Sequence, residues 1–231
     1  MSAATPASRA DDAELAGLLS RGAADLALPL ASPEVDRLIA YVRLIERWNA
    51  TYNLTAIRDP RHMVVQHILD CLAAAAALGR RRGEGRAERL VDVGSGAGLP
   101  GVVLAIAFPE REITCVDSVG KKAAFITQAA GTLRLGNVKA IHARVESIAD
   151  RFDVIASRAF ASLSEFVAET RHLLKESGTW MAMKGKTPDE ELATLAADLA
   201  FHVEPLRVPN LVAERCLVWI ECREKRAHAH E

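Results

Sequence analysis

Residues 91–101 have the composition of a ligand-binding loop. The segment reads VDVGSGAGLPG and contains Gly94, Gly96 and Gly98. Glycine lets the backbone turn sharply and lets a ligand approach without a Cβ atom in the way. Asp117 closes the next apolar run, about twenty residues after the loop, where a carboxylate can accept hydrogen bonds from ribose hydroxyls. Together these residues predict a site for a cofactor that contains a nucleoside.

Two classes of cofactor use such a loop, and the spacing of the glycines separates them. A dinucleotide requires G-x-G-x-x-G to seat its pyrophosphate, but the sixth position counted from Gly94 is Leu99. The spacing found is G-x-G-x-G, preceded by Asp92, which resembles the S-adenosylmethionine loop of class I methyltransferases. We therefore expect S-adenosyl-L-methionine ahead of NAD. A plain turn between a strand and a helix would not need three glycines at this spacing.

Strands and helices alternate around this loop. Apolar runs predict strands at residues 89–93, 113–116, 138–142, 152–156 and 179–184. Helices are predicted from Pro100 onward, at 121–135, after residue 142, at 162–174 and at 188–199. Two last strands, 201–208 and 216–222, have no helix between them. The pattern predicts an α/β fold with a doubly wound, Rossmann-like sheet, mostly parallel with an antiparallel C-terminal edge.

The first third of the chain is predicted to be helical. The predicted elements are a helix at 13–28, a second helix at 33–48 capped by Ser32, an ordered loop at 49–60, a third helix at 61–78 and an exposed linker at 79–88. This gives an N-terminal helical segment (1–86) packed on the core, a cofactor-binding core (87–224) and a flexible tail (225–231).

Charge and cysteine content restrict the class of protein. The formal net charge is −1, yet residues 37–90 contain ten arginines, no lysine and five acids. Arginines can grip phosphate, although a solvated helical surface is the simpler interpretation. The four cysteines form no CxxC pair and no histidine cluster has metal-ligand spacing, so we expect reduced thiols and no metal. Without a signal peptide or an apolar run long enough for a bilayer, we expect a cytoplasmic protein with no membrane partner.

Several short motifs between residues 48 and 186 point to one family. They are Trp48-Asn49, NLTAI at 53–57, HILD at 67–70, GSGAGLPG at 94–101, Asp117-Ser118 with Lys121-Lys122, RVE at 144–146, SRAFA at 157–161 and KGK at 184–186. In combination they resemble the small-subunit ribosomal RNA methyltransferase G family, also called glucose-inhibited division protein B. One departure is Cys71, where the family is expected to have serine; a packing effect is expected there.

The resemblance implies a reaction and a set of cofactor contacts. The donor is S-adenosyl-L-methionine, the acceptor is N7 of a guanine in 16S rRNA, and the partner is the small ribosomal subunit. Gly94 and Leu99 are expected to line the cofactor loop. Val145 and Glu146 are expected to flank the adenine. Arg158 is expected at the junction of cofactor and substrate.

Substrate contacts are expected from both halves of the chain. Lys184 and Lys186 follow the fifth predicted strand, at the same edge of the sheet as the glycine loop, and are expected to contact RNA phosphates. Asn53, Arg58 and His67 belong to the helical segment, which we expect to form one wall of an RNA groove.

Four side chains have two interpretations each. Arg158 suits either a ligand contact or a salt bridge at a strand end. Phe160 suits either stacking on a splayed base or packing in the core. His67 and Asp70 lie one helical turn apart and are expected to share a hydrogen bond, in either a structural or a substrate-binding role.

The proposed chemistry needs no catalytic base. Guanine N7 has a lone pair and no proton, so we expect catalysis by positioning and charge alone. Residues 157–160 read SRAF rather than the Asn/Asp-Pro-Pro-aromatic segment of amine methyltransferases, and no cysteine lies in a catalytic loop. The alternatives are a small-molecule or protein methyltransferase, a noncatalytic RNA-binding assembly factor and, third, an NAD-dependent dehydrogenase.

Overall fold

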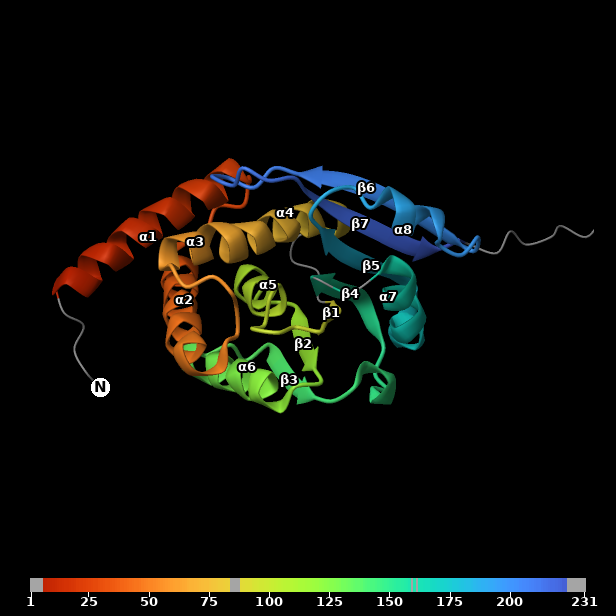
Figure 1. Cartoon of the computed structure of the whole chain (residues 1–231), viewed down its shortest axis with the longest axis horizontal. Coiled ribbons are helices and arrows are strands. Elements are labelled where there is room, and N and C mark those ends of the chain that lie inside the picture. Colours follow the sequence, from red (N-terminus) through yellow and green to blue (C-terminus); the bar gives the residue numbers. More distant parts are fainter. Residues whose placement is uncertain (1–5, 84–87, 159, 161, 224–231) are drawn as a thin grey trace, which may run out of the picture.

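A seven-stranded sheet forms the centre of the molecule (Figure 1). The computed structural model describes residues 6–83, 88–158, 160 and 162–223. The sheet order is β3-β2-β1-β4-β5-β7-β6. The strands are β1 Arg89–Val93, β2 Glu112–Asp117, β3 Val138–His142, β4 Phe152–Arg158, β5 Leu174–Lys184, β6 Leu199–Leu206 and β7 Arg215–Cys222. The first five run parallel, and β7 is antiparallel to both β5 and β6. The predicted fold class is therefore confirmed.

Helices cover both faces of the sheet. The α-helices are α1 Pro6–Asp25, α2 Ser32–Tyr52, α3 Pro60–Met63, α4 Asp70–Arg82, α5 Gly101–Ala107, α6 Gly120–Leu133, α7 Leu163–Thr170 and α8 Asp189–Ala193. A π-helical turn η1 (Val64–Leu69) joins α3 to α4, and 3-10 turns occur at η2 (Val145–Ser147) and η3 (Arg171–Leu173). As Figure 1 shows, α1, α2, α4, α5 and α6 lie on one side of the sheet, and α7 and α8 lie on the other.

The alternation of side chains along the strands separates two cores. In β1, Leu90 belongs to the core beneath α2, α4, α5 and α6, whereas Val91 and Val93 belong to the core beneath α7. Successive side chains of a strand point to opposite faces, so a strand covered on both faces must be apolar at nearly every position. This constraint explains why the parallel strands could be recognised as continuous apolar runs.

Several predicted helices are shorter in the structure. The helix expected at 188–199 is confined to α8, which buries no side chain and so lacks the packing that stabilises a longer helix. The segment after β3 forms only the 3-10 turn η2. Ser32 does not cap α2: Ala31 occupies the N-cap, and Ser32 is already helical.

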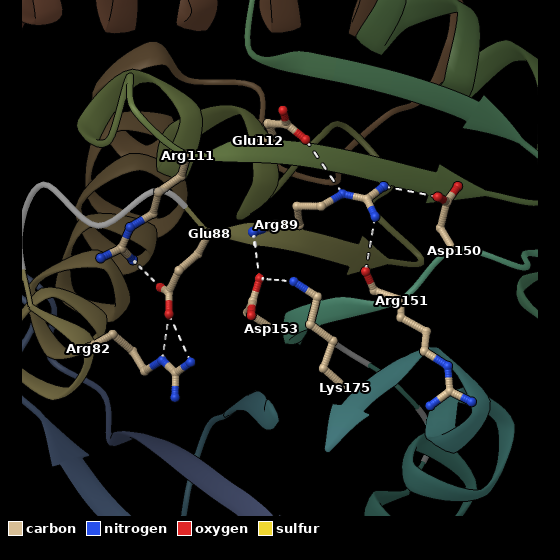
Figure 2. A network of polar contacts seen from close by, with 9 residues as sticks. All are labelled: Arg82, Glu88, Arg89, Arg111, Glu112, Asp150, Arg151, Asp153 and Lys175. Carbon is tan, nitrogen blue, oxygen red and sulfur yellow. Dashed lines mark hydrogen bonds and ion pairs between the residues drawn. The ribbon is translucent and has the colours of Figure 1, made fainter. Parts of the chain in front are cut away.

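The predicted exposed linker at 79–88 is only partly found: residues 80, 81 and 83 are exposed, but residues 79–82 are helical and residue 88 is buried. Helix α4 continues to Arg82, and Glu88 is buried just before β1, while residues 84–87 lie outside the described part of the chain. Figure 2 shows Glu88 between two arginines. The carboxylate accepts from Arg82 Nε at 2.9 Å and forms an ion pair with Arg111 NH1 at 3.7 Å. Mutual neutralisation allows these charges to be buried, which composition alone did not reveal.

Two of the predicted domain limits fall on residues that the structure does not describe. The boundary at residues 86 and 87 and the tail at 225–231 lie outside the described residues, so both stay predictions. Side chains of α1, α2, η1 and α4 share one hydrophobic core with α5 and α6. We propose on this basis that the helical segment and the sheet form one structural unit.

The stretch Pro60–Arg82 passes a length and composition test for membrane helices. It has 23 residues, and 89% of its apolar window is buried inside the protein. Polar residues interrupt this stretch, so the search for continuous apolar runs does not reveal it. Core helices of soluble proteins pass the same test, so the buried helix is explained by its packing beneath the sheet.

The buried carboxylate of Glu88 is predicted to be important for stability. Glu88→Gln removes a buried carboxylate that pairs with both Arg82 and the fully buried Arg111, so the free energy of unfolding should fall by about 3 kcal/mol in urea denaturation. Glu112→Gln is the matched control, because its carboxylate is 77% exposed and pairs with Arg89 at 3.5 Å. That change should cost less than about 1 kcal/mol. Equal costs for the two variants would contradict the prediction.

Candidate cofactor and substrate site

The glycine loop joins the end of β1 to the start of α5. Gly94, Gly96 and Gly98 have φ values of +68°, +59° and +82°, in the region that favours glycine. A Cβ atom added at Gly94 would have no protein atom within 4 Å, so the loop leaves open space there. A Cβ atom at Gly98 would lie 2.7 Å from Val102 Cγ2. The first glycine therefore leaves room for a ligand, whereas the last allows the loop to pack on α5.

Buried polar groups hold the loop from below. Asp92 Oδ2 accepts a hydrogen bond from the Gly101 amide at 2.9 Å, and Ser95 Oγ donates to the Asp92 carbonyl at 2.8 Å. From α2, the Tyr41 hydroxyl donates to the carbonyl of Ala97. Burial raises the pKa of Asp92 to about 6, although the hydrogen bond from the Gly101 amide lowers it. The loop is thus fixed before any ligand binds.

Asp117 at the end of β2 connects the loop to α6. Its Oδ2 accepts from the Gly96 amide and its Oδ1 accepts from the Val119 amide, both at 2.8 Å. Lys122 Nζ lies 3.8 Å from Oδ2. These bonds orient the carboxylate at the carboxyl edge of the sheet. The predicted contact between Asp117 and a ribose stays a prediction.

Four predicted cofactor residues line one cavity. This loop cavity, of about 260 Å³, is bordered by Gly94, Asp117, Val145 and Glu146, with Phe160 at its wall. The 3-10 turn η2 places Val145 and Glu146 there, after the third strand. The structure therefore brings together the residues expected on the ribose and adenine sides of the cofactor.

The last part of the glycine loop, residues 97–100, is buried, whereas Gly96 is half-buried. Leu99 is buried in the core, and the Cβ direction of Gly98 is filled by Val102, Tyr41 and Ile126. Only backbone atoms of these two residues are available to a cofactor. Phe160 packs against Phe166 with ring centroids 5.4 Å apart, which agrees with the core-packing interpretation of that residue.

A second cavity contains three other predicted site residues. This Arg158 cavity, of about 430 Å³, combines side chains of the helical segment with the ends of β4, β5 and β7. It is lined by Ile57, Gln66, His67, Asp70, Arg158, Met183, Lys184, Gly185 and Arg215. The structure therefore supports the expectation that the helical segment forms part of the same site as the sheet.

Arg158 joins the end of β4 to the helical segment. Its NH1 lies 3.5 Å from Asp70 Oδ2, 3.3 Å from His67 Nδ1 and 3.4 Å from the Gln66 carbonyl oxygen. Gln66 and His67 both belong to the π-helical turn, a geometry that often occurs at functional sites. The strand-end salt bridge is thus present, while a contact with cofactor or substrate stays a prediction.

Asp70 is shared by two arginines. Arg215 Nε at the start of β7 donates to Asp70 Oδ1 at 3.0 Å, opposite the contact with Arg158. Burial is the larger effect and raises the pKa of Asp70, although both guanidinium groups lower it. The predicted hydrogen bond between His67 and Asp70 is not found among the described residues, because both side chains turn toward Arg158. Arg215 was not among the predicted site residues; it reaches the cavity because its strand pairs antiparallel with the end of β5, next to Lys184.

His67 is held in a neutral state. Burial, together with the nearby Arg158 cation, lowers the pKa of His67 to about 4. Its Nε2 lies 2.7 Å from Thr55 Oγ1, and its Nδ1 lies 3.0 Å from the Gln66 carbonyl oxygen. The ring therefore connects the loop before α3 to the Arg158 cavity without adding charge.

The remaining predicted substrate residues lie in two places. Lys184 Nζ contacts both carboxylate oxygens of Glu191, at 3.0 and 2.8 Å, at the wall of the Arg158 cavity. Lys186 is exposed beyond that wall. Asn53 and Arg58 are exposed and bonded to each other, with Arg58 NH2 donating to Asn53 Oδ1 at 3.1 Å. Their roles in RNA binding stay predictions.

Known proteins match the chain over these elements. The sequence model of the rRNA small subunit methyltransferase G family matches residues 34–218. A "Ribosomal RNA small subunit methyltransferase G" from Acidovorax ebreus is 53% identical over 210 residues, which cover 87% of this chain and 93% of that protein. A protein of the same name from Leptothrix cholodnii is 54% identical over 207 residues, covering 89% and 94%.

The chain belongs to the rRNA small subunit methyltransferase G family. Solved structures similar to this family member share its fold at low identity. The ribosomal protein L11 methylase of Lactobacillus delbrueckii has a TM-score of 0.53 and 15% identity, covering 66% of this chain and 77% of that one. A SAM-dependent methyltransferase from Aquifex aeolicus has a TM-score of 0.52 and 13% identity, covering 73% and 96%. These likenesses confirm the class I methyltransferase fold.

The lowered pKa of His67 predicts a pH-dependent stability. An unfolded histidine takes up a proton near pH 6.5, whereas folded His67 does so only near pH 4. Between these values the unfolded state binds more protons, so this residue makes the free energy of unfolding fall as the pH falls. Asp92, whose pKa is raised to about 6, has the opposite effect and partly masks it.

Comparison with a His67→Gln variant isolates the histidine, because Asp92 is present in both proteins. The advantage of the wild type over the variant should shrink by up to about 3 kcal/mol between about pH 7.5 and about pH 4.5. Urea denaturation at both pH values measures it. An advantage that stays constant across the two pH values would show that the folded histidine titrates normally.

Proposed function

We propose that this family member transfers the methyl group of S-adenosyl-L-methionine to N7 of a guanine in 16S rRNA. Family membership carries the reaction class, since relatives that are 53% and 54% identical to this chain are named ribosomal RNA small subunit methyltransferase G. The observation that supports it in this chain is the placement of two cavities at the carboxyl edge of one sheet. Doubly wound folds bind their ligands at this edge.

The loop cavity has the chemistry that the cofactor requires. The open side of Gly94 admits a ligand to the backbone, and the Asp117 carboxylate provides acceptors for ribose hydroxyls. Val145 offers an apolar surface to the adenine, and Glu146 offers a polar group beside it. When bound, S-adenosyl-L-methionine supplies an electrophilic methyl group on its sulfonium.

The Arg158 cavity is proposed to hold the acceptor guanine. Methyl transfer needs nucleophile, carbon and sulfur in line, and N7 has a lone pair that attacks without losing a proton. The neutral His67 and the carboxylate of Asp70 fit this chemistry, because they limit the positive charge that Arg158 and Arg215 would otherwise place beside a ring that becomes cationic. Catalysis by positioning therefore needs no dedicated base.

The substrate class rests on charge as well as on family membership. Lysine and arginine side chains suit RNA phosphates. In the Arg158 cavity these are Lys184 and Arg215, and near it are the exposed Lys186 and, on the helical segment, Arg58.

Among the described residues, no group of three or more His, Cys, Asp or Glu side chains could hold a metal. A ribosomal substrate places the proposed activity in the cytoplasm.

A methyl-transfer assay on small ribosomal subunits that lack the modification tests the proposal. With labelled S-adenosyl-L-methionine, the wild type should label one guanine at N7. Arg158→Gln should lower the rate about 100-fold, because it removes the guanidinium group that joins β4 to the helical segment inside the proposed guanine site. Arg151→Gln is the matched control, since Arg151 lies just before the other end of β4, where it donates to the Leu174 carbonyl, and it should retain the wild-type rate.

Absence of label would contradict the proposal in an informative way. If the wild type binds S-adenosyl-L-methionine but leaves the subunits unlabelled, a small-molecule or protein methyltransferase becomes the better assignment. If it binds the subunits but no cofactor, a noncatalytic assembly factor does. Equal activity of the Arg158 and Arg151 variants would remove Arg158 from the proposed site.

A further inference from the structure

An exposed aromatic ring stands at the C-terminal end of α2. Tyr52 is 41% exposed and is one of four large hydrophobic side chains that are exposed among the described residues. Its ring lies 4.9 Å from that of Trp48, one turn earlier, at an angle of 37°. Trp48 in turn meets the buried Phe125 of α6 edge-on at 5.3 Å. A column of three rings thus supports Tyr52 from the core outward.

Two exposed arginines lie on the chain segments on either side of this ring. The chain turns directly after it at Asn53, whose φ is +49°, and Arg58 returns to donate to the Asn53 side chain at 3.1 Å. Arg58 itself is exposed, as is Arg47 on the last turns of α2. A supported aromatic face beside guanidinium groups is the combination with which proteins bind single-stranded nucleic acid.

Hydrogen bonds of Asn49 join the last turns of α2, which carry Tyr52, to the loop that reaches the Arg158 cavity. Asn49 accepts from the Thr55 amide at 2.9 Å and donates to the Ile57 carbonyl at 3.0 Å. The Thr55 hydroxyl contacts His67, and Ile57 lines the Arg158 cavity. Four residues lie between Tyr52 and Ile57, so the two Cα atoms are at most about 18 Å apart. The loop between them is therefore a fixed connection over a short distance.

If the target guanine belongs to an RNA helix, it must leave its stack to be methylated at N7, and its neighbour then loses a stacking partner. The N7 atom faces the major groove, which in A-form RNA is too deep and narrow for side chains to enter. The target must therefore leave the helical stack to reach an enclosed cavity. A flanking base then loses one stacking surface, which an aromatic side chain can replace.

We propose that Tyr52, supported by Trp48, is a stacking platform for a base that flanks the target guanine, with Arg58 contacting the adjoining phosphate. This assignment rests on the proposed function, since it takes the Arg158 cavity as the place of the target base. It adds an RNA-binding site outside both cavities. The platform contributes affinity for RNA and takes no part in cofactor binding.

Kinetics of three variants on unmodified small subunits test the platform. At saturating S-adenosyl-L-methionine, Tyr52→Ala should raise the KM for subunits about tenfold, with kcat within about twofold of wild type. Tyr52→Phe keeps the aromatic face and should stay within about twofold of the wild-type KM. Phe201→Ala is the matched control, because Phe201 is 49% exposed but lies on β6, the edge strand at the opposite end of the sheet from β3. It should leave KM unchanged.

Two further measurements separate the possible failures. Calorimetry with S-adenosyl-L-methionine should give one affinity for all four proteins, and urea denaturation should show that each variant is folded. A wild type that fails to methylate subunits would overturn the proposed function. A methylating wild type whose KM is unchanged by Tyr52→Ala, or raised equally by Phe201→Ala, would overturn the platform alone. A destabilised Tyr52→Ala protein with weakened cofactor affinity would also overturn it.

Discussion

Asp70 lies buried between Arg158 and Arg215, and its ion pairs with these two arginines join three parts of the chain. Asp70 begins α4 in the helical segment, Arg158 ends β4, and Arg215 begins β7. A carboxylate that is removed from water needs such partners, because an unpaired buried charge is costly. The same ion pairs therefore dock the helices on the carboxyl edge of the sheet and shape the Arg158 cavity. The site exists only when the whole chain is folded.

The two cavities differ in what holds them. The loop cavity depends on backbone geometry: three glycines at positive φ, with Asp92 and Asp117 accepting hydrogen bonds from amides of the loop and of the two following helices. The Arg158 cavity depends on side-chain charge, balanced so that a neutral His67 and a carboxylate face the arginines. A cofactor with many polar contacts suits the first cavity, and a ring that gains positive charge suits the second. One cavity for the cofactor and one for the guanine agree with methyl transfer by alignment alone.

The sequence allowed much of the fold to be predicted because the determining signals were local. The continuous apolar strands required burial on both faces, and the spacing from Gly94 to Gly98 required left-handed backbone. The loop cavity could be assembled in advance, since its residues follow successive parallel strands whose carboxyl ends meet.

The parts that escaped prediction depend on contacts between distant residues. Glu88 and Arg111 have the composition of surface charges, and only their pairing in the folded chain shows that they are buried. The sequence of residues 79–88 therefore predicts an exposed linker. A single π-helical turn of six residues is too short to leave a periodic pattern in the sequence, and within it His67 contacts Arg158 rather than Asp70. Arg215 lies in the site because β7 pairs with β5, and the sequence pattern does not specify which strands pair.

In the proposed complex, the methyl group of the cofactor in the loop cavity meets the guanine in the Arg158 cavity. A crystal structure with bound S-adenosylhomocysteine tests this most directly. The account predicts the adenine beside Val145 and Glu146, the ribose hydroxyls at Asp117, and the sulfur atom directed into the Arg158 cavity. A ligand bound elsewhere, or a sulfur atom directed away from Arg158, would contradict it.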